Sequence, residues 1–375
     1  MEKIYLDNAA TTALRPEVAT EMMGILQNEY GNPSSSHSFG RTAKSKLELA
    51  RKTIAQLLNV AAQEIIFTSG ATEANNWVLQ NAVTTLQVKR IITTRVEHHA
   101  VLHAVEFMQK NQEIQVDFVK IKTDGSIDIN HLMELLSEEI PTLVSLMHVN
   151  NETGTILDLE EIATICKQHA VYFHSDTVQS VGKMELDLQK IPVDFMVASA
   201  HKFHGPKGVG FAFIRKGLSL KPIFHGGEQE KGIRPGTESL HNIVGMAKAL
   251  QISYQNLEAE RNYIQELKDY TITQLQNKFP DVAFNGSVNK ALYTILNVRL
   301  PLDASKSSML LFNLDMKGIA VSRGSACQSG SARPSHVLAA FLTQEEVLKP
   351  SVRVSFSHFN TKKEIDILIE ALLAL

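Results

Sequence analysis

A lysine stands directly after an apolar, strand-like run near the middle of the chain. Residues 194–199 (DFMVAS) are followed by His201 and Lys202, and a glycine-rich turn begins at Gly205. In open α/β sheets, ligands bind beyond the carboxyl ends of the strands, so Lys202 would lie at such a site. An amine placed there can form a Schiff base with the aldehyde of pyridoxal phosphate. The alternative is a solvated lysine in a loop, which is common for an isolated lysine.

A carboxylate and an amide stand at the end of a second apolar run. Residues 171–175 (VYFHS) precede Asp176, and Gln179 lies three residues further on. An aspartate at this place can keep a pyridinium nitrogen protonated, and the amide of Gln179 can donate to the ring hydroxyl. An aspartate after a strand is also a common helix N-cap, so the pair alone does not decide between the two interpretations.

A third segment predicts a phosphate-binding turn. Residues 65–79 (IIFTSGATEANNWVL) are typical of a strand, a tight turn and a helix that begins near Gly70, Ala71 and Thr72. The N–H groups and the dipole of a helix N-terminus can hold a phosphate without a basic residue. Simple capping of the helix by Ser69 or Thr72 would explain the same residues without a ligand.

Strand-like runs alternate with helical patterns through most of the first 215 residues. This alternation predicts an α/β fold with a large domain built on a mostly parallel seven-stranded sheet. A long helical stretch over 242–278 would join it to a smaller α+β domain. We expect the large domain to span 12–258 and the small one to comprise 1–11 and 259–375. The strand-like runs are IIF, RIITT, QVDFVKI, TLVSLMHV, VYFHS, DFMVAS and VGFAFI.

The bulk composition favours a globular enzyme and excludes several other classes. The 375 residues are 44% hydrophobic and 21% charged, with a formal net charge of −3, so no basic field would attract nucleic acid or an anionic membrane. The sequence has no secretory signal pattern and no apolar run long enough to span a bilayer, which predicts a cytoplasmic protein. Its two cysteines provide no disulfide framework and no cysteine-rich metal site.

Ten short motifs, in order and over nearly the whole chain, resemble those of the NifS/IscS-like cysteine desulfurases, within class V of the fold-type I pyridoxal-phosphate enzymes. The resemblance implies an enzyme that removes sulfur from L-cysteine, giving L-alanine and a persulfide on Cys327. The sulfur would pass to an acceptor protein for iron–sulfur cluster assembly or tRNA thiolation. A selenocysteine lyase or another class V lyase or aminotransferase is the alternative, and a catalytically idle scaffold is the remaining one. The motifs are D-N-A-A-T-T, N-P-S-S-x-H, G-A-T-E, E-H, H-V-N-N-E-T-G, D-x-x-Q-S-x-G-K, S-A-H-K, R-x-G-T, G-S-A-C and P-S-H-V-L.

The resemblance also implies the roles of individual residues. Lys202 would be the Schiff-base lysine, and Arg353 and Asn151 would bind the substrate. His98 would stack on the cofactor ring and assist proton transfers, for which its aromatic face and near-neutral pKa are suited. Thr237 would reach the phosphate of the neighbouring subunit, which implies a homodimer. The phosphate would be held by Ala71, Thr72, Ser199 and His201, and the ring by Asp176, Gln179 and Asn151.

Two of these residues also have simpler interpretations. Arg353 lies in an apolar strand pattern (SVRVSF), where it needs an anionic partner, either a substrate carboxylate or an internal acid. His98 is followed by His99 and His103, whose i, i+4 spacing would suit a metal pair. Since no third ligand is near in the sequence, we expect a solvated helix face and no metal.

The two cysteines differ in their sequence surroundings. Cys327 lies in a run of small, polar residues, 321–331, that predicts an exposed loop, where the cations of Arg323 and Arg333 could favour the thiolate. This G-S-A-C pattern resembles the longer-loop group of the family, although members often have a small residue in place of Arg323. Cys166 lies on the apolar face of a predicted helix and is interpreted as a core residue.

Overall fold

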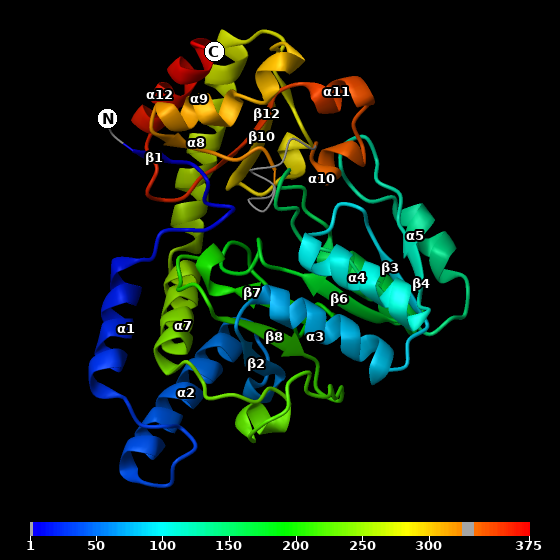
Figure 1. The fold of residues 1–375 in the computed structure, drawn as a ribbon, viewed down its shortest axis with the longest axis vertical. Helices are drawn as coiled ribbons and strands as arrows, with labels where there is room; N and C mark the ends of the chain where they lie inside the picture. The colour runs from blue at the N-terminus through cyan, green and yellow to red at the C-terminus, as the bar shows by residue number, and fades with distance from the viewer. Residues whose placement is uncertain (1–2, 325–333) are drawn as a thin grey trace.

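The computed structural model describes residues 3–324 and 334–375 and contains a seven-stranded sheet (Figure 1). All neighbouring strands are parallel except at β8, which runs antiparallel to both of its neighbours. The α/β fold with a mostly parallel seven-stranded sheet is therefore confirmed. The strands, in spatial order, are β2 (Ile65–Thr68), β8 (Gly210–Ile214), β7 (Phe195–Ser199), β6 (Tyr172–Asp176), β5 (Thr142–Ser145), β3 (Arg90–Thr93) and β4 (Gln115–Phe118).

Helices cover both faces of this sheet because its strands are apolar on both sides. Ile91 and Ile92 are adjacent in β3 and fully buried, yet they belong to two different hydrophobic cores. Successive side chains of a strand point to opposite faces, so each core marks one face. One core contains α3 (Ala71–Thr84) and α4 (His99–Gln112); the other contains α1 (Pro16–Asn28), α2 (Ser38–Leu57), α5 (Ile129–Leu136), α6 (Leu159–Gln168) and α7 (Leu240–Gln255).

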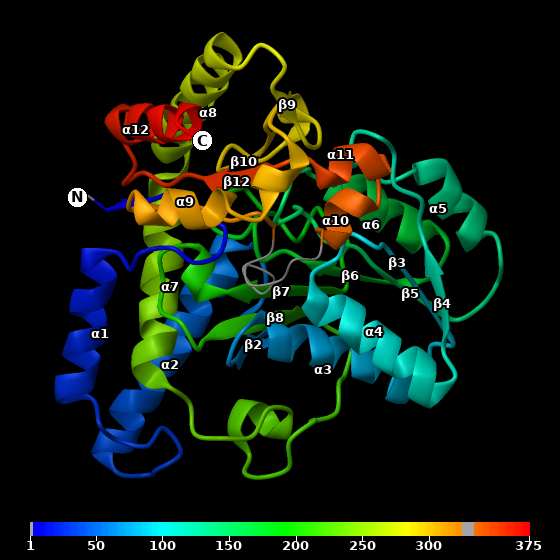
Figure 2. The same ribbon diagram turned by 45° about the horizontal axis from the view of Figure 1, so that its top comes forward.

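A third core holds together the beginning of the chain and its last hundred or so residues. Its three-stranded antiparallel sheet has the order β12 (Ser351–Ser355), β10 (Ile295–Arg299), β9 (Ala283–Phe284), and β1 (Ile4–Tyr5) pairs in parallel with β11 (Ile319–Ala320). This part lies beyond the carboxyl ends of β6 and β7 (Figure 2). The helices of the C-terminal part are α8 (Leu257–Lys278), α9 (Leu310–Met316), α10 (His336–Ala339), α11 (Gln344–Leu348) and α12 (Lys362–Leu373).

The long helical stretch predicted over 242–278 is two helices. α7 ends and α8 begins at Asn256, whose φ and ψ of −102° and 7° interrupt the helical backbone. The assignment of 12–258 to one domain, and of 1–11 with 259–375 to the other, stays a prediction. Among the helices of the described residues, none is both long and apolar enough to cross a membrane.

Buried histidines should make the stability of the fold sensitive to acid. Burial lowers the pKa of His148 and of His174 to about 4 and that of His204 to about 3, from an ordinary value of 6.5. Between pH 6.5 and 4 the unfolded chain therefore binds three protons that the folded chain does not, and each lowers the free energy of unfolding by ~1.4 kcal/mol per pH unit. Burial raises the pKa of Glu97 to about 8, which has the opposite sign over this window and offsets one of the three.

We expect the free energy of unfolding to fall by about 2 kcal/mol from pH 6.5 to pH 5.5 through these groups. Urea denaturation at the two pH values measures the change. His174→Asn should reduce the pH dependence, whereas His169→Asn, at an exposed position, should not. A pH dependence that survives unchanged in His174→Asn would contradict this explanation.

Candidate active site

The predicted site residues converge on one cavity of about 250 Å³ at the carboxyl ends of β6 and β7. The N-termini of α3 and α4 and strand β12 also contribute to its lining. Thr237 does not line this cavity and is exposed, and Cys327 lies outside the described residues, as does Arg333. The predicted residues that line the cavity are Ala71, Thr72, His98, Asn151, Asp176, Gln179, Ser199, His201, Lys202 and Arg353.

Lys202 is held by the N-terminal segment of the chain. It ends the short 3-10 helix Ala200–Lys202 that follows β7, and its Nζ donates to the carbonyl oxygens of Ala9 and Ala10, both at 2.8 Å. The carbonyl oxygen of His201 accepts from the backbone N–H of Thr12 at 2.9 Å. The amine is therefore directed into the cavity by two segments that are far apart in the sequence.

Asp176 ends β6 as a buried carboxylate with defined partners. Its Oδ2 accepts from Asn75 Nδ2 at 2.8 Å and its Oδ1 from the N–H of Val178 at 3.1 Å. Turns follow Asp176, and the next described helix is the 3-10 segment Ala200–Lys202, so the N-cap interpretation of this aspartate is wrong. These two hydrogen bonds orient the carboxylate toward the place where a pyridinium nitrogen could meet it.

The sequence analysis did not predict that Asn75 belongs to the site. It lies fully buried on α3, lines the cavity and orients Asp176. An asparagine on the buried face of a helix needs a polar partner, and that was the available signal.

If the cavity holds pyridoxal phosphate and turns over cysteine, as the sequence resemblance implies, we expect Asp176→Asn to keep the fold and the cofactor but to lower turnover by about 100- to 1000-fold, because a neutral amide no longer favours a protonated ring nitrogen. Asn75→Asp, which would put a second carboxylate beside Asp176, should lower it as well, whereas Asn76→Ala, on a partly exposed position of the same helix, should not. Steady-state alanine formation measures all three. Full activity of Asp176→Asn would contradict the role of this carboxylate.

His98 is the N-cap of α4, and this contact determines the tautomer of its ring. Its Nδ1 accepts from the N–H of Ala100 at 3.1 Å. Burial lowers the pKa of His98, Asp176 opposes this, and the neighbouring Lys202 lowers it further. The ring is thus neutral near pH 7 with its proton on Nε2, and it presents a hydrogen-bond donor to the cavity.

The rings of the histidines that follow His98 pack against one another. The rings of His99 and His103 are stacked, with their centroids 4.8 Å apart and an angle of 27° between their planes. The ring centroid of His336 lies 4.5 Å from that of His99. Over residues 3–324 and 334–375, no group of three or more metal-ligating side chains was found. The expected solvated face is only partly seen, because His103 is exposed whereas His99 is half-buried.

The start of α3 is shaped to accept a ligand. Gly70 has a φ of +152°, and a Cβ there would lie 3.2 Å from Ser199 Oγ, which itself accepts from the N–H of Ala71 at 2.9 Å. No side chain caps the helix at Gly70, and Ser69 instead donates to Glu73. The interpretation that Ser69 or Thr72 simply caps this helix is therefore wrong.

Arg353 has the internal acid that the sequence left unidentified. Its Nη2 donates to Asp7 Oδ1 at 2.7 Å and its Nη1 to the carbonyl oxygen of Asn151 at 2.8 Å. Within the part of the chain that the structure describes, its buried Nε has no hydrogen-bond partner. Arg353 thus has an internal ion pair and also lines the cavity.

Gln179 is oriented by a buried lysine. Its Nε2 donates to the carbonyl oxygen of Ala9 at 2.9 Å, and its Oε1 accepts from Lys183 Nζ at 3.0 Å. Burial, with Lys202 and Arg353 nearby, lowers the pKa of Lys183 to about 7. Lys183, the last residue of the motif D-x-x-Q-S-x-G-K, therefore supports the site by orienting Gln179.

The sequence also predicted the surroundings of Cys166 and an effect of Arg323. Cys166 is buried in the core on α6, as predicted, and burial raises the pKa of its thiol. Arg323 donates to Ser307 Oγ at 2.8 Å, and burial lowers the pKa of its guanidinium. Its predicted effect on the Cys327 thiol stays a prediction.

A doubly wound sheet with a lysine, a carboxylate and a helix N-terminus at its carboxyl edge is the arrangement expected of a pyridoxal-phosphate-dependent enzyme. The chain belongs to the aminotransferase class-V family, whose model matches residues 4–368. It is 39% identical over 372 residues to the cysteine desulfurase IscS of Dictyoglomus turgidum, covering 99% of this chain and 93% of that protein. It is 38% identical over 369 residues to the cysteine desulfurase IscS of Methanosarcina thermophila, covering 98% and 90%.

Solved structures give the same result for the fold. A NifS-like protein superposes with a TM-score of 0.92 at 34% identity, covering 100% of this chain and 99% of that one. A NifS-like protein from Rickettsia africae has a TM-score of 0.88 at 31% identity, covering 99% and 98%. SspA, solved in complex with cysteine, has a TM-score of 0.81 at 29% identity, covering 96% and 100%.

Proposed function

We propose that this chain is a cysteine desulfurase that carries pyridoxal phosphate on Lys202 and moves the sulfur of L-cysteine to Cys327. The full-length similarity to IscS cysteine desulfurases supports the activity. The observation that carries the assignment to residues is the single cavity lined by Lys202, Asp176, His98 and Arg353.

The residues of the cavity fit the cofactor. The buried carboxylate of Asp176, the Gln179 amide and the N-terminus of α3 match the three polar groups of the cofactor: ring nitrogen, ring hydroxyl and phosphate. Ala71, Thr72, Ser199 and His201 surround the phosphate position in this proposal. Pyridoxal phosphate, when bound, supplies an electron sink for the electron pair released at the substrate α-carbon.

The substrate is held by its carboxylate. Arg353 lies in β12 at the cavity wall, and its guanidinium can grip a carboxylate with two hydrogen bonds. The contacts to Asp7 and to the carbonyl oxygen of Asn151 hold that guanidinium in place. The related SspA, solved with cysteine, makes this amino acid a reasonable occupant of the same position.

The protons are moved by Lys202 and His98. Once the substrate amine has replaced it, the Lys202 amine can take the α-proton. The neutral ring of His98, with its proton on Nε2, can donate a hydrogen bond to the bound groups. The Cys327 thiolate then attacks the substrate sulfur: a sulfur–sulfur bond forms, the carbon–sulfur bond breaks, and the carbon takes up a proton to give alanine.

Incubation of the purified protein with L-cysteine tests this function. We expect equal amounts of alanine and persulfide sulfur in a single turnover without added thiol. Release of elemental selenium from selenocysteine with no reaction of cysteine would favour a selenocysteine lyase. Transfer of the amino group to a keto acid would favour an aminotransferase, and either result would contradict the proposal.

A homodimer with shared sites accounts for the position of Thr237. This residue is exposed and does not line the cavity of its own chain. Arg234, three residues earlier, pairs with Glu73 on the first turn of α3 at 2.8 Å, so the segment is anchored close to the proposed phosphate position. Thr237 would reach the cofactor phosphate of the partner subunit.

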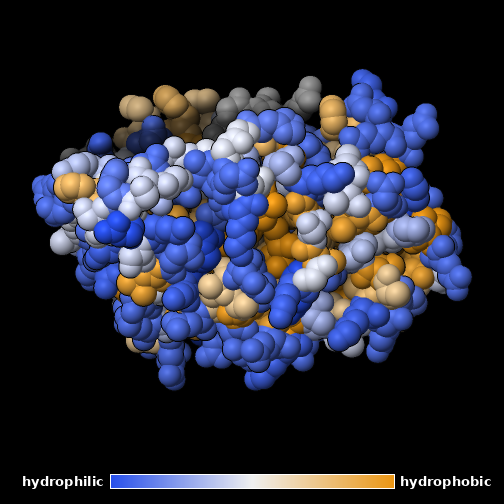
Figure 3. Space-filling model, turned by 90° about the horizontal axis from the view of Figure 1, so that it is seen from below, coloured by the Kyte–Doolittle hydropathy of each residue, from blue (hydrophilic) through white to orange (hydrophobic). Residues whose placement is uncertain are grey.

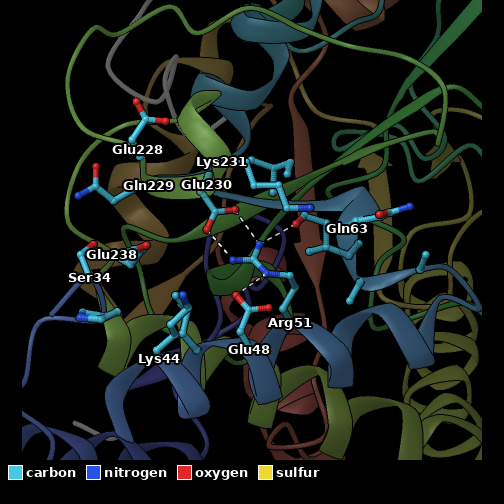
Figure 4. A pocket seen from close by; sticks show the side chains of 16 residues that line it. Ser34, Lys44, Glu48, Arg51, Gln63, Glu228, Gln229, Glu230, Lys231 and Glu238 are labelled. Carbon is cyan, nitrogen blue, oxygen red and sulfur yellow. Dashed lines mark hydrogen bonds and ion pairs between the residues drawn. The ribbon is translucent and has the colours of Figure 1, made fainter. Parts of the chain in front are cut away.

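An ion pair fixes the beginning of the same segment. Arg51 and Glu230 line a hollow of about 750 Å³ and are joined by hydrogen bonds of 2.6 and 2.7 Å. Figure 4 shows how the two side chains face each other. Glu230 and Lys231 have φ of 48° and 59°, a conformation that non-glycine residues rarely adopt without compensation. Figure 3 views the molecule from this side and shows apolar side chains gathered near the middle of a polar surface, as expected of a face that a second copy covers.

Mixing two inactive variants tests the shared site. In a heterodimer of Lys202→Ala and Thr237→Ala chains, one site combines an intact Lys202 with the partner's intact Thr237. We expect mixing and reassociation to restore activity that neither variant has alone. A monomer in solution, or no gain on mixing, would contradict the shared site.

For the destination of the sulfur we propose a class of acceptor protein and no particular protein. An acceptor protein in iron–sulfur cluster assembly or tRNA thiolation would take the persulfide sulfur from Cys327, and we propose that this occurs in the cytoplasm. Neither nucleic acid nor a membrane is a proposed partner, and no metal is proposed at the site.

A further inference from the structure

We propose that Glu97 is a positioning residue that fastens the chain ahead of α4 to the chain beyond β5 and thereby holds the ring of His98 at the active-site cavity. The inference rests on the proposed function, because it concerns the way in which His98 is placed for proton transfer. It is carried by the contacts of one buried side chain and of the backbone on both sides of it.

One carboxyl oxygen of Glu97 joins the ends of two neighbouring strands. Its Oε1 accepts from the N–H of Met147 at 2.8 Å and from Thr94 Oγ1 at 3.1 Å. Thr94 directly follows β3 and Met147 lies just beyond β5, and these two strands pair in parallel. Since the same oxygen accepts from both donors, Glu97 holds the two strand ends together.

The backbone around Glu97 is held as well. The carbonyl oxygen of Val96 accepts from Asn150 Nδ2 at 2.9 Å, and the carbonyl oxygen of Glu97 lies 3.0 Å from His336 Nε2. Glu97 is 1% exposed, so water competes little for these contacts. The chain that leads into His98 is therefore fixed through its side chains and through its backbone.

His98 is the next residue, and the direction of its ring depends on that chain. Its Nδ1 accepts from the N–H of Ala100 as the N-cap of α4, so the ring follows the backbone at the start of this helix. His98 and Met147 both line the active-site cavity. Glu97 thus ties two walls of the cavity together, and a shift of this loop would displace the ring from the groups that it serves.

The charge state of Glu97 agrees with a positioning role. Burial raises the pKa of its carboxyl to about 8, and the negative charge of Asp176, at the end of β6, adds to this effect. The other titratable groups beside it are His98 on α4 and His336 on α10, and its Oε2 has no hydrogen-bond partner among the described residues. Near pH 7 the carboxyl is therefore mostly neutral, and it accepts two hydrogen bonds without adding a charge that would raise the pKa of His98.

Glu97→Leu tests the proposal, with Glu97→Gln as the conservative variant. The amide oxygen of Gln can accept from Met147 and Thr94, whereas Leu has no acceptor. We expect Glu97→Leu to lower kcat for cysteine by about 100-fold and to change KM less than about threefold, because the substrate carboxylate is bound from β12. Glu97→Gln should keep most of the wild-type kcat at pH 7. Glu106→Gln, at an exposed position of α4, should change neither constant.

Thr94→Val removes one of the two donors and keeps the proposal testable if Glu97→Leu does not fold. We expect a smaller loss, of about 2- to 10-fold in kcat, because the hydrogen bond from Met147 remains. An unchanged kcat in Glu97→Leu or in Thr94→Val would overturn the positioning role. Equal losses in Glu97→Leu and Glu97→Gln would overturn it too, since the lost acidic group and not the lost acceptor would then explain both.

The pH profile gives a readout that a merely structural role would not move. The kcat of the wild type should fall above about pH 8 as Glu97 ionises, because its buried charge is then repelled by Asp176. Gln does not ionise, so this fall should be absent in Glu97→Gln. The same fall in both proteins would overturn the role of the neutral acid.

The ring of His98 can also be observed without the cofactor. In cofactor-free protein made with nitrogen-labelled histidine, the nuclear magnetic resonance signals of His98 are those missing from His98→Gln. We expect the wild type and Glu97→Gln to share these signals, with the proton on Nε2, and Glu97→Leu to shift them. Unchanged His98 signals in Glu97→Leu would overturn the inference. Absence of persulfide in the wild type instead overturns the proposed function and leaves this comparison intact.

Discussion

Lys202→Ala should abolish turnover of cysteine, with a loss of at least about 1000-fold. The side chain is assigned two tasks, the covalent link to the cofactor and removal of the α-proton, and no other lysine lines the cavity among the described residues. The purified variant should also lose the visible absorption of the linked cofactor. Alanine formation and the absorption spectrum measure the two effects.

Lys207→Ala is the matched control for this prediction. Lys207 lies five residues further on, in the exposed turn after the site, and does not line the cavity. Its replacement should leave both spectrum and turnover unchanged. Equal losses in the two variants, or activity retained in Lys202→Ala, would contradict the assignment of the amine.

Cys327→Ser should abolish formation of persulfide and of alanine while substrate binding is kept. A serine hydroxyl is far less nucleophilic toward sulfur than a thiolate, whereas the groups proposed to bind cysteine, Arg353 and Asn151, are unchanged in this variant. The variant should therefore still change its absorption when cysteine is added. Rapid-quench analysis of alanine should show a loss of about 1000-fold or more, since the attacking group itself is removed.

Cys166→Ala provides the comparison. Cys166 lies on α6 in a hydrophobic core and is 1% exposed, so its replacement should lower the free energy of unfolding somewhat and leave the chemistry intact. Continued production of alanine by Cys327→Ser, or its disappearance in Cys166→Ala at full folding, would contradict the assignment of the nucleophile.

The sequence predicted the sheet well because most of its strands contain a short apolar run, as β2, β7 and β8 do. Residues such as Phe195 and Phe211 are buried on both faces of the sheet, and a run buried on both faces leaves a clear signal. The break at Asn256 between α7 and α8 left no such signal, because neither a glycine nor a proline marks it.

The site was predicted as a set of residues but not as a network of contacts. Asp176 and Ser199 each end a strand and Lys202 lies just after one, and the topology of the sheet brings strand ends together. The partners of these residues depend on chain segments that meet only in the folded protein. Asp7 is 346 residues from Arg353 in the sequence, and Asn75 is 101 residues from Asp176, so neither pairing was predictable from local pattern.

The most direct test of the account is reduction of the purified protein with borohydride followed by mass analysis of its peptides. Borohydride converts a Schiff base into a stable amine and so fixes the cofactor where it was attached. We predict a phosphopyridoxyl group on the peptide that contains Lys202, and on that peptide alone. An unmodified Lys202 in protein that has been supplied with pyridoxal phosphate, or a modification at Lys183 or Lys207 in its place, would contradict the central claim.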